Sequence, residues 1–184
     1  MPRQSTAHEM SMAFDKYANA LTVLDENHRM IHDGFMFTGW ARDETVAIGA
    51  KFYMLLQVPA HTFPHLQIFE VNADGAPLVY DLHEGTTFSS AGTAVTMFNR
   101  NRNSSNAAKT VVTHSPTVTD EGTVIDLHYV PSTGVGQTGI IDQSTWGEFV
   151  LAPNTNYLIG IHNDSGQARD ITMNIGLYEI GPDN

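Results

Sequence analysis

The sequence contains no cysteine among its 184 residues. It therefore has no disulfide framework, no thiolate ligand for a metal and no cysteine nucleophile. A chain of this length can bury roughly 70% of the surface that its unfolded form exposes, so we expect one domain that is stable without cross-links. Folding in a reducing cytoplasm is the simplest expectation.

Positive charge and long apolar runs are also scarce. Nine Lys and Arg residues stand against 20 Asp and Glu residues, which gives a formal net charge of −11 at pH 7. Nucleic acids and anionic membranes are bound through clustered cations, so we expect neither as a partner. No run of about 18 apolar residues occurs, and the first ten residues lack the apolar stretch of a signal peptide. The sequence favours a soluble protein.

Alternating apolar residues are the strongest pattern from residue 28 onward. The clearest example runs from Val46 to Leu56, where every second residue is apolar and would lie on one face of a strand. Asp74-Gly75 separates two more such runs, residues 65–71 and 77–83, and is typical of a hairpin. Further strands are expected at residues 94–98, 110–114, 123–130, 148–151, 157–162 and 171–180.

These strands predict the fold class. About nine or ten short strands, joined by loops rich in Gly, Ser, Thr and Asn, are typical of an antiparallel sandwich. The sequence therefore predicts an all-β protein, with a single antiparallel β-sandwich or jelly-roll-like domain over residues 27–184. Residues 84–93 and 131–145 are long enough to be functional loops rather than tight turns.

Residues 1–26 follow a different pattern and are expected to form an N-terminal helix or an extended arm. Four apolar residues recur at helical spacings of three and four: Met10, Phe14, Tyr17 and Leu21. This spacing is typical of an amphipathic helix. Residues 20–24 could equally begin a strand within an arm that becomes ordered on a partner. Either structure leaves an apolar surface to be buried, so these four residues are candidates for partner contact.

Histidine spacing raises the question of a metal site. His28 and His32, and also His61 and His65, are separated by three residues. On a helix this spacing brings two imidazoles to one ion, but we expect strand or proline-containing loop here. Residues four apart on a strand lie about 13 Å from each other, too far for one ion. The sequence therefore predicts no metal site and no cofactor.

No enzyme motif is present in the sequence. It lacks the Gly-x-Ser-x-Gly elbow, the Gly-x-Gly-x-x-Gly fingerprint and the Walker loop. The adjacent acids Asp120 and Glu121 precede Gly122, which is typical of a solvated turn rather than a catalytic pair. We therefore predict no catalytic residues and a protein that is not an enzyme.

The most unusual string is FNRNRNSS, residues 98–105. We expect its Asn and Ser side chains to cap backbone groups in a bend. Arg100 and Arg102 are expected to pair with acidic neighbours, either within the chain or across a subunit contact. They are therefore further candidates for partner contact. Two arginines on so acidic a chain are too small a footprint for a nucleic acid.

Seven short motifs follow one another in a distinctive order. They are NHRMIHDG at residues 27–34, LHEG at 82–85, NRNRNS at 99–104, HSPTVTDEGT at 114–123, LAPNTNYL at 151–158, NDSG at 163–166 and LYE at 177–179. In this order, over residues 27–180, the chain resembles a family of tailed-bacteriophage virion proteins. Ala152 stands where the resemblance leads us to expect a lysine, and residues 1–26 fall outside it.

The resemblance implies a structural component of the phage head. We expect a capsid decoration, or cement, protein that binds the major capsid protein on the outside of the virion and stabilises the shell by bridging its subunits. It would assemble in the host cytoplasm as a homo-oligomer, expected to be a trimer. Such a protein acts through interface area, about 1,600 Å² for a stable contact, and gains avidity from each added contact.

Two alternatives stay open. The first is a tail- or fibre-associated lectin-like module whose loops, including residues 86–90 and 129–138, recognise a bacterial surface glycan. Exposure of Trp40 or Trp146, the two tryptophans, would favour it. The second is a cupin-like metalloprotein, which needs several histidines and a carboxylate to converge inside the barrel.

Overall fold

The computed structural model describes residues 12–15, 20–23, 26–131, 139–142 and 148–180. The elements, in chain order, are β1 (Met12–Asp15), β2 (Ala20–Val23), α1 (Glu26–His32), β3 (Met36–Val46), β4 (Lys51–Gln57), β5 (Phe63–Ala73), β6 (Leu78–Glu84), β7 (Thr87–Ser90), β8 (Thr93–Ala94), β9 (Phe98–Asn99), β10 (Val111–His114), β11 (Thr117–Asp120), β12 (Thr123–Val130), β13 (Gly139–Asp142), β14 (Phe149–Val150), β15 (Asn156–Asn163) and β16 (Arg169–Ile180). The described part has no helix long and apolar enough to cross a bilayer.

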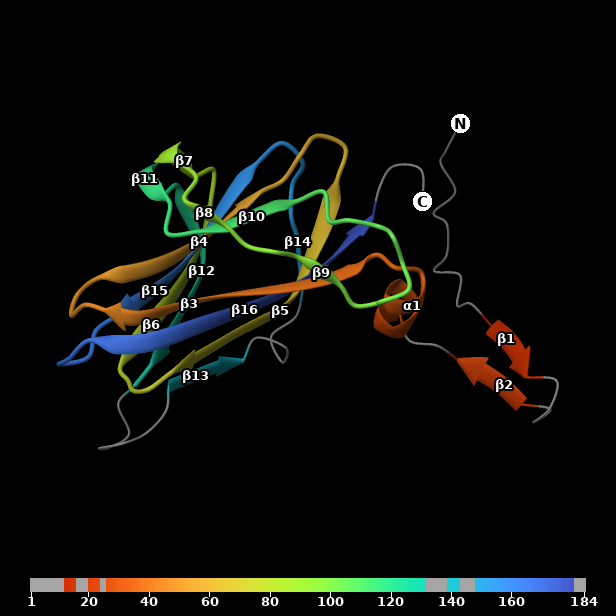
Figure 1. The fold of residues 1–184 in the computed structure, drawn as a ribbon, viewed down its shortest axis with the longest axis horizontal. Coiled ribbons are helices and arrows are strands. Elements are labelled where there is room, and N and C mark those ends of the chain that lie inside the picture. Colours follow the sequence, from red (N-terminus) through yellow and green to blue (C-terminus); the bar gives the residue numbers. More distant parts are fainter. Residues whose placement is uncertain (1–11, 16–19, 24–25, 132–138, 143–147, 181–184) are drawn as a thin grey trace.

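Two large antiparallel sheets pack face to face (Figure 1). The strand order is β12-β6-β15-β4-β10-β8 in the first sheet and β13-β5-β16-β3-β9 in the second, where β14 also pairs with β5. Along the chain the main strands alternate between the sheets except at β6 and β12, which pair with each other: β3, β5, β13 and β16 lie in one sheet and β4, β6, β12 and β15 in the other. This connectivity is that of a jelly roll. The predicted all-β antiparallel sandwich is confirmed.

An apolar core fills the space between the sheets. The first sheet contributes Phe52 and Met54 of β4 and Ile159 of β15, and the second contributes Met173 and Ile175 of β16. All five side chains are buried to 2% exposure or less. Because successive residues of a strand point to opposite faces, the residues that alternate with Phe52 and Met54 point away from the core. Lys51 and Tyr53 of β4 therefore lie on the outer face of the first sheet, where they are partly exposed.

The pattern over residues 46–56 belongs to two strands, not to the one that we predicted. β3 ends at Val46, and Gly49, with φ of 71°, turns the chain before β4 begins at Lys51. Ile48 lies in this turn and is 63% exposed. The predicted buried face is correct from Phe52 onward and wrong at Ile48. The sequence did not show the turn, because apolar residues continue at every second position through it.

The predicted hairpin at Asp74-Gly75 is also wrong. β5 and β6, which this segment connects, do not pair with each other and lie in different sheets. The segment is bonded instead to the start of β16: the Asp74 amide donates to the carbonyl of Asp170 (3.2 Å), and the Asp170 amide donates to Asp74 Oδ1 (3.1 Å). These bonds make the segment a corner that carries the chain from one sheet to the other.

The N-terminal hairpin, β1 and β2, stands apart from the sandwich. The two strands pair only with each other, with Phe14 opposite Leu21 in the register. Figure 1 shows the hairpin at one end of the molecule, beyond α1. Of the two expected structures, the described residues have the extended one, and the helical reading is wrong at Phe14 and Leu21. Met10 and Tyr17 lie outside the described residues.

The FNRNRNSS bend packs beside α1, which was not expected from the sequence. The Asn99 amide donates to the carbonyl of Gly34 (2.8 Å), and the Asn101 amide donates to the carbonyl of His32 (2.8 Å). Asn99 Oδ1 accepts from the Asn101 backbone (2.9 Å), and Ser104 Oγ accepts from the Asn106 backbone (3.1 Å). The predicted capping by Asn and Ser is confirmed, and it brings this bend to the same end of the molecule as α1.

Glu148 joins β5 and β16 at their edge. Its carboxylate accepts hydrogen bonds from Gln67 Nε2 (2.6 Å) and the Tyr178 hydroxyl (3.1 and 3.2 Å), and it lies 2.5 Å from His65 Nδ1. Burial alone raises the pKa of Glu148, but the bonds from Gln67, His65 and Tyr178 outweigh it, so this pKa lies below its usual value. The ionised carboxylate therefore stabilises the fold.

We expect Glu148→Gln to lower the free energy of unfolding by about 1 kcal/mol at pH 7. A lowered pKa means that the stabilisation is complete above the unfolded-state pKa, about 4.3, and is lost as the pH falls through the folded-state value. Thermal unfolding of both proteins at pH 7 and near pH 3 measures this. The difference should shrink at low pH, whereas the exposed control Glu44→Gln should have little effect at either pH. An undiminished difference at low pH would show that ionisation of Glu148 is not what stabilises this edge.

Candidate functional site

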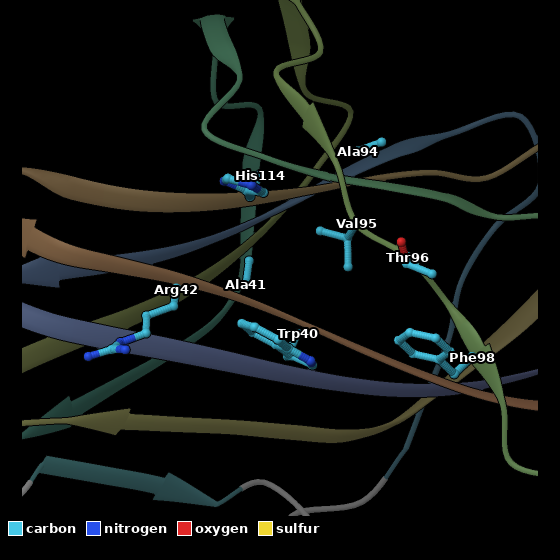
Figure 2. A pocket seen from close by; sticks show the side chains of 8 residues that line it. All are labelled: Trp40, Ala41, Arg42, Ala94, Val95, Thr96, Phe98 and His114. Atoms are coloured by element: carbon cyan, nitrogen blue, oxygen red, sulfur yellow. The ribbon is translucent and has the colours of Figure 1, made fainter.

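A groove of about 370 Å³ lies between β3 and the segment that leads from β8 to β9. We call it the aromatic groove. Its volume falls within the roughly 300–1,000 Å³ of small-ligand sites. Figure 2 shows the lining side chains, which are Trp40, Ala41, Arg42, Ala94, Val95, Thr96, Phe98 and His114.

The chain crosses from one sheet to the other to form one wall of this groove. The Val95 amide donates to the carbonyl of Val112 on the side of β10 (2.9 Å), and Phe98 pairs with Thr38 of β3. Gly39 allows the close approach: a Cβ there would lie 2.6 Å from Met97 Sδ. Glycine at position 39 therefore lets the crossing segment lie directly over β3.

Two aromatic side chains in the groove are open to solvent. Trp40 is 60% exposed and Phe98 is 44% exposed. The guanidinium of Arg102 lies over the Phe98 ring, 5.7 Å from its centroid. At the other end, Arg42 forms an ion pair with Asp170. The groove therefore combines aromatic surface with an arginine that lies over Phe98 and, at its other end, an arginine paired with Glu44 and Asp170.

The predicted pairing of the two arginines with acids of the same chain is not found. Among the described residues, neither Arg100 nor Arg102 forms a salt bridge; the Arg102 side chain donates only to the carbonyl of Asn99 (3.5 Å). The bend is held instead by hydrogen bonds from its polar side chains to its own backbone and to the carbonyls of His32 and Gly34. Pairing of these arginines across a subunit contact stays a prediction.

A second group of side chains lies on the outer face of the first sheet. The register places Asp81 of β6, Gly160 of β15 and Tyr53 of β4 side by side. Lys51 is two residues before Tyr53 on β4, and His83 is two residues after Asp81 on β6, so both lie on the same face of the sheet. Glu121 reaches this face from the turn between β11 and β12. We call the group the polar cluster, and its members are Lys51, Tyr53, Asp81, His83 and Glu121.

Lys51 is at the centre of the cluster. Its Nζ lies 3.1 Å from Asp81 Oδ2 and 2.9 Å from Glu121 Oε2. Tyr53 donates a short hydrogen bond to Glu121. His83 Nε2 lies 3.2 Å from Asp81 Oδ1 and 3.5 Å from Glu121 Oε2. A cation, a phenol and an imidazole thus converge on two carboxylates.

Burial and hydrogen bonding set the charges in this cluster. Burial alone raises the pKa of Glu121, but the bonds from Tyr53 and Lys51 outweigh it, and the pKa is lowered. Burial likewise lowers the pKa of Lys51, yet the bonds to Glu121 and Asp81 raise it overall. Burial and the bond to Glu121 both raise the pKa of Tyr53. Near neutral pH, Glu121 stays ionised, Lys51 charged and Tyr53 protonated, so none of the three is tuned for proton transfer.

Some polar atoms of the cluster have no hydrogen-bond partner. His83 is 3% exposed and Asp81 is 6% exposed. Asp81 Oδ1 and both ring nitrogens of His83 are buried without a hydrogen bond, although Asp81 Oδ1 and His83 Nε2 face each other. Buried polar atoms are rarely left unpaired in proteins, because each one costs free energy. These ligand-type atoms are therefore the unusual feature of the cluster.

The expectation of strand or proline-containing loop is wrong for one histidine pair and correct for the other. His28 and His32 lie on α1, not on a strand, and their Nε2 atoms are 2.9 Å apart. His61 lies in the turn before β5 and His65 lies on β5, which is the loop and strand context expected. Within the described residues, the one group of three or more ligand-type side chains close enough for a metal ion is Asp81, His83 and Glu121.

Sequence reasoning missed the polar cluster. The expectation of a solvated turn is wrong for Glu121, whose side chain is 35% exposed and bound by Lys51 and Tyr53. One signal was available: Asp81 and His83 are two residues apart in a strand, which places a carboxylate and an imidazole on one face. Nothing local indicates that Glu121 joins them.

Comparisons with protein-family models, with curated proteins and with solved structures give no match for this chain. The geometry described above, together with the sequence, is therefore the basis for the function proposed below.

Proposed function

We propose that the protein is a phage capsid decoration protein, which binds the outside of the head and bridges subunits of the major capsid protein. The observation that carries this proposal is the N-terminal hairpin, whose strands pair with no other described strand and which lies beyond α1 at one end of the molecule. A hairpin of two strands is at best marginally stable alone, so a partner surface is needed to hold it. The order of the seven sequence motifs supports the same class of protein.

The other candidate contact residues lie toward the same end. Hydrogen bonds tie the bend that carries Arg100 and Arg102 to the residues at the end of α1, at His32 and Gly34. Neither arginine is neutralised by a described carboxylate. The hairpin and the two arginines therefore form one proposed contact surface for capsid subunits, with apolar residues and two cations that have no ion pair among the described residues.

A second surface suits contact between copies of this chain. β12 is an edge strand of the first sheet, and four of its apolar side chains are exposed by 37–59%: Val124, Ile125, Leu127 and Tyr129. Long apolar edge strands pair readily with other chains. We assign this edge to a sister subunit of the expected trimer, because β8 at the opposite edge has only two residues. A monomeric mass in solution would contradict this assignment.

Sedimentation with phage heads tests the proposed function. Heads that lack the protein are mixed with purified protein and sedimented. The proposal predicts a saturable amount of protein in the pellet, in fixed ratio to the major capsid protein. Persistent absence from the pellet, with protein that is folded and heads that are intact, would overturn it.

The aromatic groove favours one other function, glycan binding by a tail- or fibre-associated module. Trp40 is exposed, as this alternative requires, while Trp146 lies outside the described residues. The face of a sugar ring packs on aromatic side chains, and the guanidinium of Arg102 beside Phe98 can donate hydrogen bonds to sugar hydroxyls. The groove is not built from residues 86–90 or 129–131, so the expected loops are not its walls.

We expect Trp40→Ala to abolish any glycan binding, because it removes the largest exposed aromatic surface of the groove. Binding to an array of bacterial surface glycans measures this, and Trp40→Phe should keep part of the signal. Glycan binding that Trp40→Ala leaves unchanged would exclude the groove as the site. Array binding without head binding would favour this function over capsid decoration.

A further inference from the structure

We propose that Asp81, His83 and Glu121 bind a divalent transition-metal ion, with Zn²⁺ the best fit to these ligands. The site is independent of the proposed function, since it lies on the outer face of the first sheet and uses none of the candidate contact residues. Carboxylate and imidazole ligands together suit zinc and its neighbours in the first transition series.

The distances between the ligand atoms match a tetrahedral ion. Ligands about 2.0 Å from zinc, at tetrahedral angles, lie about 3.3 Å from one another. His83 Nε2 lies 3.2 Å from Asp81 Oδ1 and 3.5 Å from Glu121 Oε2. All three ligand atoms lie within 4.8 Å of one another. Small adjustments would therefore bring them around one ion.

The unpartnered atoms give independent support. Asp81 Oδ1 and His83 Nε2 are buried and lack hydrogen bonds, in side chains that are more than nine-tenths buried. A metal ion between them would satisfy both. Gly160 keeps the space beside Asp81 open, because a Cβ at that position would lie 2.1 Å from Asp81 Oδ1. Any larger residue at position 160 would crowd this ligand.

A metal ion must compete with the ammonium group of Lys51 for the carboxylates of Asp81 and Glu121. The ammonium group carries one positive charge against the two negative charges of the carboxylates. A divalent ion would balance both negative charges. The Lys51 side chain is 25% exposed and can turn toward solvent, so an ion can replace its Nζ next to Asp81 and Glu121. Tyr53 would continue to donate to Glu121 and so orient this ligand. Three protein ligands leave a fourth position for water.

Titration of metal-free protein with Zn²⁺ by calorimetry tests the proposal. The background is His28→Ala with His32→Ala, because that pair on α1 is also spaced to chelate metal. We expect one Zn²⁺ per chain. His83→Ala should weaken its binding at least about 100-fold, and Lys51→Met should bind at least as tightly as the background. His162→Ala, whose histidine pairs with Asp164 outside the cluster, is the matched control and should bind normally.

Two further measurements keep the proposal falsifiable if His83→Ala does not fold. Glu121→Gln changes a turn residue and should weaken Zn²⁺ binding at least tenfold. Co²⁺ in the background protein should give the strong visible bands of a tetrahedral site. Absence of binding in the background protein, or binding that neither His83→Ala nor Glu121→Gln changes, would overturn the proposal.

Discussion

Gly122→Ala should destabilise the protein by about 3 kcal/mol, which lowers the melting temperature by about 9 °C for a chain of this size. Gly122 has φ of 88°, in the left-handed region, and a Cβ there would lie 2.3 Å from the carbonyl oxygen of Glu84. The contact is with backbone of β6, so no flexible side chain can move aside. The substitution therefore forces the β11–β12 turn away from the sheet.

Gly85→Ala is the matched control for this change. Gly85 has a similar φ of 79°, but a Cβ there would meet nothing within 4 Å. We expect only the conformational cost, about 1 kcal/mol, or about 3 °C. Thermal unfolding of both variants measures the difference. Equal melting temperatures would show that the turn is not held against β6 as described.

The substitution Phe14→Asp together with Leu21→Asp should reduce binding to heads by about 100-fold or more. These residues are register partners in the N-terminal hairpin, and our account makes them hot spots of the interface, where loss of one side chain costs about 2 kcal/mol or more. The melting temperature should change by no more than about 1 °C, because the hairpin pairs with neither large sheet. Sedimentation with heads and thermal unfolding give the two measurements.

A substitution outside the hairpin, in the loop between β15 and β16, is the control for this prediction. Gly166→Ala lies on the sandwich, where a Cβ would meet nothing within 4 Å, and should leave both head binding and stability unchanged. Wild-type affinity of the double variant for heads would show that the hairpin is not the contact. A large loss of stability in the double variant would show that the hairpin belongs to the folded core of the monomer.

Period-two alternation predicted individual strands well. β12, β15 and β16 occupy nearly the residues expected. β15 and β16 bury apolar side chains in the core, whereas the apolar side chains of β12 are largely exposed. Alternation does not say which strands are neighbours, and so the corner at Asp74 was interpreted as a hairpin. α1 was missed because its seven residues contribute only one buried apolar side chain, Met30, which is too short a pattern to recognise.

The candidate sites were harder to predict from the sequence than the fold. Glu121 has the local chemistry of a solvated turn, but Lys51 and Tyr53, its partners, lie about seventy residues earlier in the chain. Trp40 fits a β-strand, and nothing local shows that it points to solvent beside Phe98. Both sites are formed by contacts between segments that are far apart in the chain. Local patterns in a single sequence do not show which distant segments come together.

The most direct test of capsid decoration is a cryo-electron microscopy reconstruction of heads incubated with the protein. Our account predicts added density on the outer surface of the shell, at repeated positions, into which the jelly roll fits with the end that carries α1 facing the capsid subunits. A bare shell under conditions of excess protein, or density confined to the tail, would contradict it.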